Sequence, residues 1–222
     1  MRYYPVNLDI RDQKCLVVGG GAVGKRKLAR LVECGARVTV VDQAISDDIK
    51  ALSGRHPIEI KERNYRSSDL EGMFLVVGAT DNDEVNSRIS KDAAKKGICC
   101  NIVDRPKECT FVLPSVVKQG DLVITISTSG KSPAFAKWLR RNMSKDFGPE
   151  YGACLDLIGS VRQKFMRQGK SPEADKHLFE QLIDEGILEL VRQRNVKEVN
   201  ALLKRLFGKT FLIEEDDWNS HE

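Results

Sequence analysis

Three glycines near the start of the sequence, Gly19, Gly21 and Gly24, have the spacing GxGxxG. They follow a short apolar run typical of a buried strand and open a segment with helical periodicity. In such a turn the first glycine permits a tight bend, the second lets a diphosphate approach the backbone, and the third allows helix and strand to pack closely. The free N–H groups at the helix start, at Ala22 and Val23, then face the anion. The pattern predicts a dinucleotide-binding turn.

An acidic residue indicates which dinucleotide binds. Asp42 ends the next predicted strand, where a carboxylate can bond both ribose hydroxyls of an adenosine. That carboxylate would repel a 2′-phosphate, so the sequence predicts NAD rather than NADP, with the neighbouring Gln43 as a further cofactor contact. The alternative is a glycine-rich turn without a ligand, beside an incidental aspartate.

Residues 78–82 follow another strong strand, on the carboxyl edge of the sheet where ligands bind. We expect Thr80 and the backbone around it to contact the ribose next to the nicotinamide. An equally good interpretation is that Asp81 or Asn82 caps the following helix.

Asp104 ends the last predicted strand and reaches the same edge. Dehydrogenation removes a hydride and usually needs a base for the accompanying proton, and Asp104 is placed for that role. The alternative is a turn aspartate that ends the strand before Arg105 and Pro106.

The elements that must position these residues alternate between strand-like and helix-like patterns, as in a parallel sheet with crossover helices. Strands are predicted at 15–19, 37–41, 58–61, 74–78 and 98–103, and helices at 22–34 and 83–96. The predicted fold class is α/β, with a Rossmann-type NAD-binding domain over residues 1–113.

The second half of the sequence has a different pattern. Two β-rich runs, 110–117 and 121–128, predict a hairpin, and Ser132 with Pro133 opens a helix. The sequence beyond this helix is helical in period, with a break at 169–172. We therefore predict two further parts: a small α/β segment over residues 114–147 and an all-helical C-terminal domain over residues 148–222. The second of these includes an acidic tail at 214–217.

Composition excludes several other classes of protein. The six cysteines form no disulfide framework and the three histidines lack ligand spacing, so no stable metal site is predicted. A net charge of +4 without an arginine-rich stripe does not indicate a nucleic-acid partner. No apolar run reaches the roughly 18 residues of a membrane span, and no signal peptide begins the chain, so we expect a cytoplasmic protein.

Several motifs occur in one order and together resemble a known family. They are the glycine turn, Ala79-Thr80-Asp81, Asn101-Ile102-Val103-Asp104, Phe111–Ser115, Ser127–Pro133 and the opening Tyr4-Pro5-Val6-Asn7-Leu8. Over residues 1 to about 145 the sequence resembles the precorrin-2 dehydrogenase/sirohydrochlorin ferrochelatase family, which includes the N-terminal part of siroheme synthase.

The resemblance implies NAD-dependent oxidation of precorrin-2 to sirohydrochlorin in siroheme biosynthesis. Some members also insert ferrous iron, and the aspartate that matches Asp104 is thought to serve both steps, so iron would bind there only transiently. The resemblance also implies a homodimer built through residues 114–147, with the active site in a cleft beside the nucleotide domain.

The segment before the predicted helix at Pro133 has substrate-binding potential. Its hydroxyls and N–H groups could hold a carboxylate of the substrate, and the candidate residues are Ser127, Thr128, Ser129, Lys131 and Ser132. Plain helix capping explains Ser132 equally well. The segment is no phosphate-binding P-loop, because Thr125 occupies the position of the required upstream glycine.

Two other functions remain open from the residues alone. One is an NAD-dependent dehydrogenase of another small metabolite, because fold does not fix substrate. The other is a non-enzymatic NAD-sensing module, which would leave Asp104 and the segment 114–147 without a role.

Overall fold

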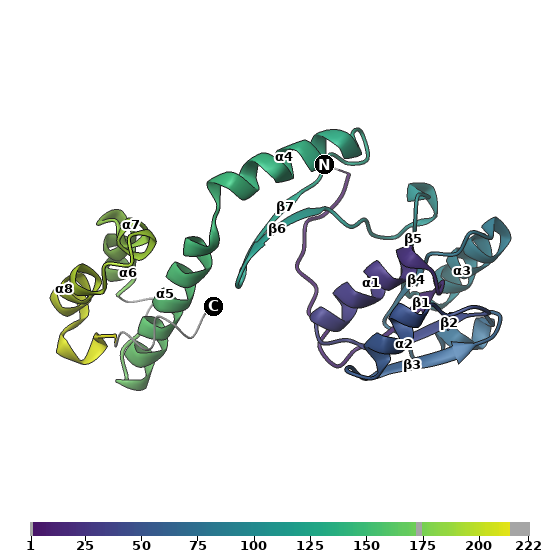
Figure 1. The fold of residues 1–222 in the computed structure, drawn as a ribbon, viewed down its shortest axis with the longest axis horizontal. Coiled ribbons are helices and arrows are strands. Elements are labelled where there is room, and N and C mark those ends of the chain that lie inside the picture. Colours follow the sequence, from purple (N-terminus) through teal and green to yellow (C-terminus); the bar gives the residue numbers. More distant parts are fainter. Residues whose placement is uncertain (1, 172–174, 214–222) are drawn as a thin grey trace. The chain divides into compact units, whose positions relative to one another are not determined.

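The computed structural model describes residues 2–171 and 175–213 (Figure 1), so the predicted acidic tail lies outside the described residues. The chain divides into two compact units, Met1–Leu113 and Pro114–Glu222. Among the described helices, none combines the length and apolar character needed to cross a membrane.

The first unit is built on a parallel sheet with the strand order β3-β2-β1-β4-β5. The strands are β1 (Lys14–Val18), β2 (Arg37–Asp42), β3 (Ile58–Glu62), β4 (Leu75–Gly78) and β5 (Cys99–Ile102). The chain builds outward from β1 to β3 and then crosses back to place β4 on the other side of β1. The order in which strands are added to the sheet therefore reverses between β1 and β4, and open α/β sheets bind ligands at this position.

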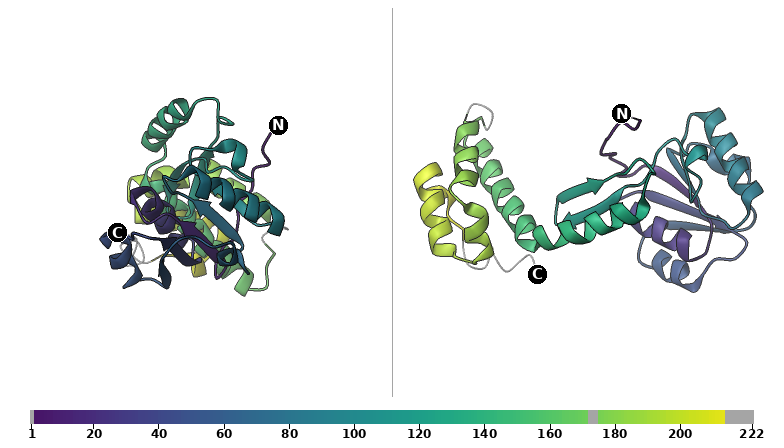
Figure 2. Two further views of the ribbon diagram at one scale, coloured as in Figure 1. Left: turned by 90° about the vertical axis from the view of Figure 1, so that its right-hand side faces the viewer. Right: turned by 90° about the horizontal axis from the view of Figure 1, so that it is seen from above.

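Helices cover both faces of this sheet (Figures 1 and 2). They are α1 (Ala22–Glu33), α2 (Asp47–Ser53) and α3 (Asp83–Lys96), with short 3-10 turns η1 (Ser67–Leu70) and η2 (Pro106–Glu108). Leu28 of α1 and Ile49 of α2 pack in one core cluster with alternate strand residues, and Ile89 of α3 packs in the cluster on the opposite face. Because both faces are covered, the central strands are apolar and buried, apart from the exposed Lys14 at the start of β1.

Two details differ from the predicted elements. Helix α2 was not predicted, because it has seven residues with one buried position, Ile49, and shows no helical period. The strand predicted over 110–117 begins only at Ser115. Residues before it return along β5 instead: the Thr110 N–H donates to the Cys100 carbonyl at 2.9 Å, and Phe111 packs against the core.

The second unit begins with an antiparallel hairpin and a long helix. They are β6 (Ser115–Gln119), β7 (Leu122–Ile126) and α4 (Pro133–Asp146). Gln119 pairs with Leu122, so the turn consists of Gly120 and Asp121, and Gly120 has a φ of 56°. A two-residue hairpin turn needs such a left-handed conformation, which glycine adopts at little cost. The predicted hairpin and helix are thus present, with the helix cap at Ser132.

The rest of this unit is helical (Figure 2). Its elements are α5 (Pro149–Arg167), α6 (Lys176–Asp184), α7 (Ile187–Arg192), α8 (Val196–Phe207) and the 3-10 turn η3 (Lys209–Phe211). Aromatic rings fill the core: Phe165 lies edge-on to Phe179 and Phe207, with centroids 5.7 and 5.9 Å away. The predicted Rossmann-type sheet and helical C-terminal region are therefore confirmed.

The boundary predicted at residue 147 stays a prediction. Both hairpin strands contact helix α5. The Gln119 side chain also donates to the carbonyl of Phe147, the residue that caps the C-terminus of α4, at 2.7 Å. A Cβ at Gly152 of α5 would lie 2.9 Å from the Gln119 carbonyl oxygen, so glycine permits close packing there. Hairpin, α4 and the C-terminal helices belong to one compact unit.

Candidate dinucleotide and active site

Four adjacent strand ends bring the predicted site residues of the first unit to one edge. Val18 of β1 pairs with Val41 of β2 and with Gly78 of β4, and Gly78 pairs with Ile102 of β5. In this register, Asp42, the glycine turn, Thr80 and Asp104 all follow the carboxyl ends of neighbouring strands. The predicted cofactor residues and the predicted catalytic residue therefore share one edge of the sheet.

The glycine turn has two kinds of glycine. Gly19 has a φ of 132°, and a Cβ there would collide with the Ala79 carbonyl; a Cβ at Gly24 would collide with the Gly19 carbonyl. Both glycines are therefore required by packing. A Cβ at Gly21 would meet no atom within 4 Å, so the space beside it is open for a diphosphate. Gly20, which was not among the predicted site residues, is also required by packing, because a Cβ there would collide with the Ala44 carbonyl.

The start of helix α1 suits an anion. Gly21 is its N-cap and supplies no side-chain cap, and no acidic residue lies in the first turn. The backbone N–H groups at Ala22 and Val23 therefore present the positive end of the helix dipole to this open space. The residues present fit a dinucleotide diphosphate.

The Asp42 carboxylate already supports the turn. It accepts a hydrogen bond from the Gly20 N–H at 2.6 Å and one from the Ala44 N–H at 3.4 Å. The carboxylate is thereby fixed beside the glycine turn, where the adenosine ribose would lie. Gln43 is exposed, and its side chain donates to Asn64 at 2.5 Å.

The loop after β4 is held by polar side chains. The Thr80 hydroxyl donates toward the Asn86 side-chain oxygen, 3.1 Å away, and buried Asn86 donates back to the Thr80 carbonyl at 2.8 Å. Asn82 caps α3 by accepting from the N–H groups of Glu84 and Val85. The capping interpretation is thus correct for Asn82, while Thr80 occupies a fixed position at the edge.

Asp104 is an exposed residue in a left-handed backbone conformation, with a φ of 59°. Asp tolerates this conformation better than most residues, at a cost of up to about 1–2 kcal/mol. The turn that follows β5 therefore presents the carboxylate to solvent at the edge of the sheet. Such strained residues concentrate at functional sites.

Lys27 is a residue of this region that the sequence analysis missed. It is half-buried on α1, and burial, together with the positive charges of Arg30 and Arg26, lowers the pKa of its ammonium group. The negative charge of Asp104 acts in the opposite direction, so Lys27 lies within electrostatic range of the candidate catalytic residue. Val103, packed in the same core cluster as Leu28, brings the two segments together. Its position on a helix flank gave no signal in the sequence.

The loop after β7 contains the predicted substrate residues. Thr128 and Ser132 hold it: the Thr128 hydroxyl bonds the Ser132 backbone at 3.1 and 3.3 Å, and the Ser132 hydroxyl accepts from the Phe135 N–H at 3.1 Å. Ser129 has a φ of 54°, and its N–H lies 3.3 Å from the Ser127 hydroxyl. Ser127, Ser129 and Lys131 are exposed.

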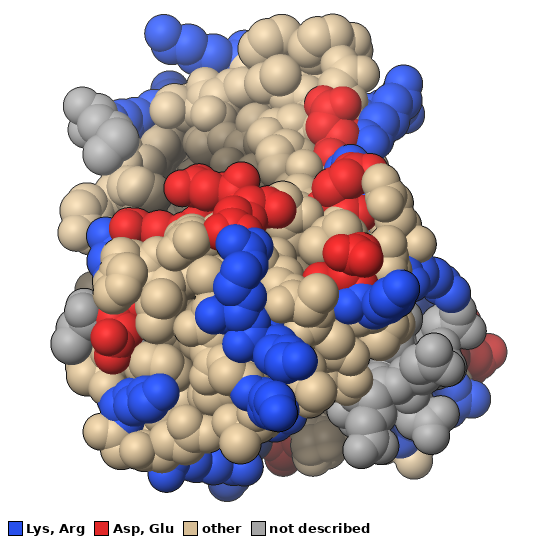
Figure 3. All heavy atoms as spheres, turned by 90° about the vertical axis from the view of Figure 1, so that its left-hand side faces the viewer, with Lys and Arg blue, Asp and Glu red and all other residues tan. Residues whose placement is uncertain are grey.

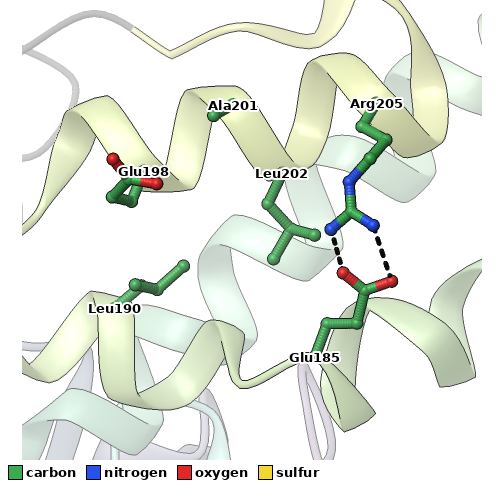
Figure 4. A pocket seen from close by; sticks show the side chains of 6 residues that line it. All are labelled: Glu185, Leu190, Glu198, Ala201, Leu202 and Arg205. Atoms are coloured by element: carbon green, nitrogen blue, oxygen red, sulfur yellow. Dashed lines mark hydrogen bonds and ion pairs between the residues drawn. The ribbon is translucent and has the colours of Figure 1, made fainter.

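A hollow in the helical region lies between α7 and α8 (Figure 4). It is lined by Glu185, Leu190, Glu198, Ala201, Leu202 and Arg205. Arg205 closes one end by a paired interaction with Glu185, which lowers the pKa of that carboxyl group. On the face in Figure 3, positive and negative side chains lie interspersed. No predicted site residue lines the hollow.

Within residues 2–171 and 175–213, no three His, Cys, Asp or Glu side chains are grouped so that they could hold a metal ion. Asp104 therefore does not belong to a preformed metal cluster in the described part of the chain.

Comparison with known proteins relates both units to siroheme biosynthesis. Residues 6–115 match the model of an NAD(P)-binding family, and residues 119–145 match the central region of sirohaem biosynthesis proteins. The solved structure of SirC, a precorrin-2 dehydrogenase, superposes with a TM-score of 0.77 and 26% identity, covering 92% of this chain and 98% of SirC. The chain belongs to the precorrin-2 dehydrogenase and siroheme synthase family.

The siroheme synthases to which the chain is similar are longer. The siroheme synthase of Methylococcus capsulatus is 30% identical over 99% of this chain and 46% of its own length. That of Ruthia magnifica is 32% identical over 95% of this chain and 45% of its own length. The chain therefore spans less than half the length of these siroheme synthases.

Proposed function

We propose that the protein oxidises precorrin-2 to sirohydrochlorin with NAD as the hydride acceptor. The observation that carries the proposal is the shared sheet edge, where an open glycine turn, Asp42, Thr80 and Asp104 follow neighbouring strands. Family membership and the likeness to SirC supply the substrate class.

Each group at the edge has a distinct part in this reaction. The N–H groups of Ala22 and Val23 bind the diphosphate, Asp42 accepts hydrogen bonds from the adenosine ribose, and Thr80 contacts the second ribose. Gln43 lines the adenosine end. When bound, NAD supplies the acceptor for a hydride. Asp104 takes the proton that leaves the macrocycle, so that two electrons and one proton pass to NAD and a second proton to the carboxylate.

The substrate carries carboxylates, and the second unit offers groups that would bind them. We assign this contact to the loop after β7, through Ser127, Thr128, Ser129, Lys131 and Ser132. The basic residues Lys137, Arg140, Arg141 and Lys145 recur along α4, although a solvated face explains them equally well.

A homodimer through residues 114–147 belongs to the same proposal. Helix α4 exposes Phe135 and Trp138, which stack with centroids 5.6 Å apart, and Val123 of β7 is also exposed. Aromatic residues of this kind are enriched at protein interfaces. We also propose a cytoplasmic location, which is the expected location of a biosynthetic enzyme of this kind.

The test is anaerobic incubation of the purified protein with precorrin-2 and either NAD or NADP, following reduced cofactor and sirohydrochlorin by absorbance. We expect NADH formation that requires precorrin-2 and a clear preference for NAD. Tight NAD binding without turnover would favour a sensing module, and turnover with another metabolite would favour a different dehydrogenase. Adding ferrous iron afterwards tests the extension to metal insertion, in which Asp104 would bind iron transiently; siroheme must then form faster than without enzyme.

A further inference from the structure

The side chains of Cys109 and Arg105 hold the turn that carries Asp104, and neither residue has a role in the proposed function. The turn runs from Ile102 to Cys109 and includes η2. The Ile102 N–H donates to the Cys109 Sγ at 3.1 Å, and the Sγ lies 3.2 Å from the carbonyl oxygens of Ile102 and Arg105. The single thiol hydrogen is thus shared between two acceptors on either side of Asp104.

A second contact fixes the outside of the same turn. The Arg105 guanidinium donates to Glu108 at 3.0 Å and forms an ion pair with Asp83 at the start of α3. These two carboxylates hold the pKa of Arg105 above its usual range, with the Glu108 hydrogen bond as the larger cause. The guanidinium therefore ties the turn to a helix that begins beside Thr80.

We propose that Cys109 and Arg105 are positioning residues, which hold the Asp104 carboxylate in place for proton transfer. Asp104 itself has a left-handed backbone, a conformation that an unsupported turn would leave. The thiol restrains the backbone on both sides of Asp104, and Arg105 fixes the turn relative to α3. The inference rests on the proposed function, because it presumes that Asp104 is the base.

Cys109 suits this task because its thiol stays protonated. Burial raises the pKa of the thiol. The group therefore remains a donor to backbone carbonyls at neutral pH. Serine retains a donor and an acceptor at this position, whereas alanine has neither.

The experiment compares Cys109→Ala, Cys109→Ser and Arg105→Met with the full wild-type chain. We expect Cys109→Ala to lower kcat for NADH formation by roughly 10- to 100-fold, because small displacements of a reacting group are costly. KM and the NAD dissociation constant stay within about twofold, and Cys109→Ser restores much of kcat. Arg105→Met is expected to lower kcat less, by about tenfold.

Cys100→Ala is the matched control, since it removes a buried thiol from β5 that packs in the core and does not close the turn. It should lower the melting temperature while leaving kcat unchanged. Equal loss of kcat in Cys100→Ala and Cys109→Ala, or unchanged kcat in Cys109→Ala, would overturn the inference.

Hydrogen exchange separates this inference from the proposed function. The Ile102 amide should exchange faster in Cys109→Ala than in the wild type, whether or not precorrin-2 is the substrate. An inactive wild type would refute the proposed function. Unchanged Ile102 exchange in the variant would refute the positioning role.

Discussion

The loops that carry candidate site residues are held differently in the two units. At the sheet edge of the first unit, some residues hold the backbone and others face the ligand: Gly24 is required by packing, while Gly21 borders open space. In the loop after β7, Thr128 and Ser132 are both candidate ligands and the groups that close the loop. Structure and function are therefore separable by mutation in the first unit and combined in the second.

The largest expected effect on turnover comes from replacing the Asp104 carboxylate, which faces solvent and does not hold the backbone. Asp104→Asn should lower turnover of precorrin-2 by about 10²- to 10⁴-fold, because asparagine cannot accept the proton. Asparagine tolerates the left-handed backbone, so the melting temperature and NAD affinity should stay unchanged.

Asp12→Asn is the matched control for this variant. Asp12 has the same φ of 59° but pairs with Arg37 at the opposite end of β2, away from the site. Wild-type turnover in Asp104→Asn would refute the base assignment. A large loss of turnover in Asp12→Asn would show that the loss in Asp104→Asn need not come from removing a base.

In the glycine turn, one substitution should affect mainly the stability of the fold and another mainly the binding of NAD. Gly24→Ala should lower the free energy of unfolding by at least about 2 kcal/mol, since its methyl group collides with the Gly19 carbonyl. Gly21→Ala should keep the melting temperature but weaken NAD binding roughly tenfold, or ~1.4 kcal/mol. Denaturant melts and NAD titration measure both; full NAD affinity in folded Gly21→Ala would contradict the placement of the diphosphate.

Asp42 is an exception within the first unit, because it supports the turn and also faces the proposed ribose. Asp42→Asn should weaken NAD binding about tenfold and narrow the preference over NADP, because the charge that repels a 2′-phosphate is lost. Asparagine keeps only one acceptor oxygen, so one of the two bonds from the Gly20 and Ala44 N–H groups is lost and the melting temperature should also fall. Undiminished NAD preference would show that Asp42 serves only the turn.

The smallest effects are expected in the loop after β7. Thr128→Val should cost about 1 kcal/mol of stability through the lost hydrogen bonds and also raise KM for precorrin-2. Lys131→Met should raise KM about threefold without changing stability, as expected for an exposed ionic contact. If Thr128→Val raised KM with no loss of stability, the two roles would be separable here as well.

Much of the edge could be predicted because its residues are local to strand ends. Gly19, Gly21, Gly24, Asp42 and Asp104 each follow an apolar run, so periodicity alone placed them. The short helix α2 lacked a detectable period, and the strand predicted at 110 was wrong because Thr110 bonds β5 instead.

Residues that act at a distance could not be found in this way. The contacts of Cys109 and Arg105 depend on how the turn after β5 folds back. The charge of Asp104 reaches Lys27 only because α1 and the end of β5 pack together. In the loop after β7, Ser132 fits both a helix cap and a substrate ligand, so the sequence alone does not distinguish the two roles.

The order of the strands sets how far a ligand must extend along the sheet edge to reach from Asp42 to Asp104. From β2 to β5 there are three intervals between neighbouring strands, which at about 4.8 Å each separate the two ends of the edge by roughly 14 Å. A ligand that stops short of the Asp104 end, such as ADP-ribose, which lacks only the nicotinamide, should compete with NAD yet leave the Asp104 end open. Two ligands with equal affinity for the glycine turn then differ in effect: the one long enough to extend to Asp104 acts as a cofactor, and the shorter one acts as an inhibitor.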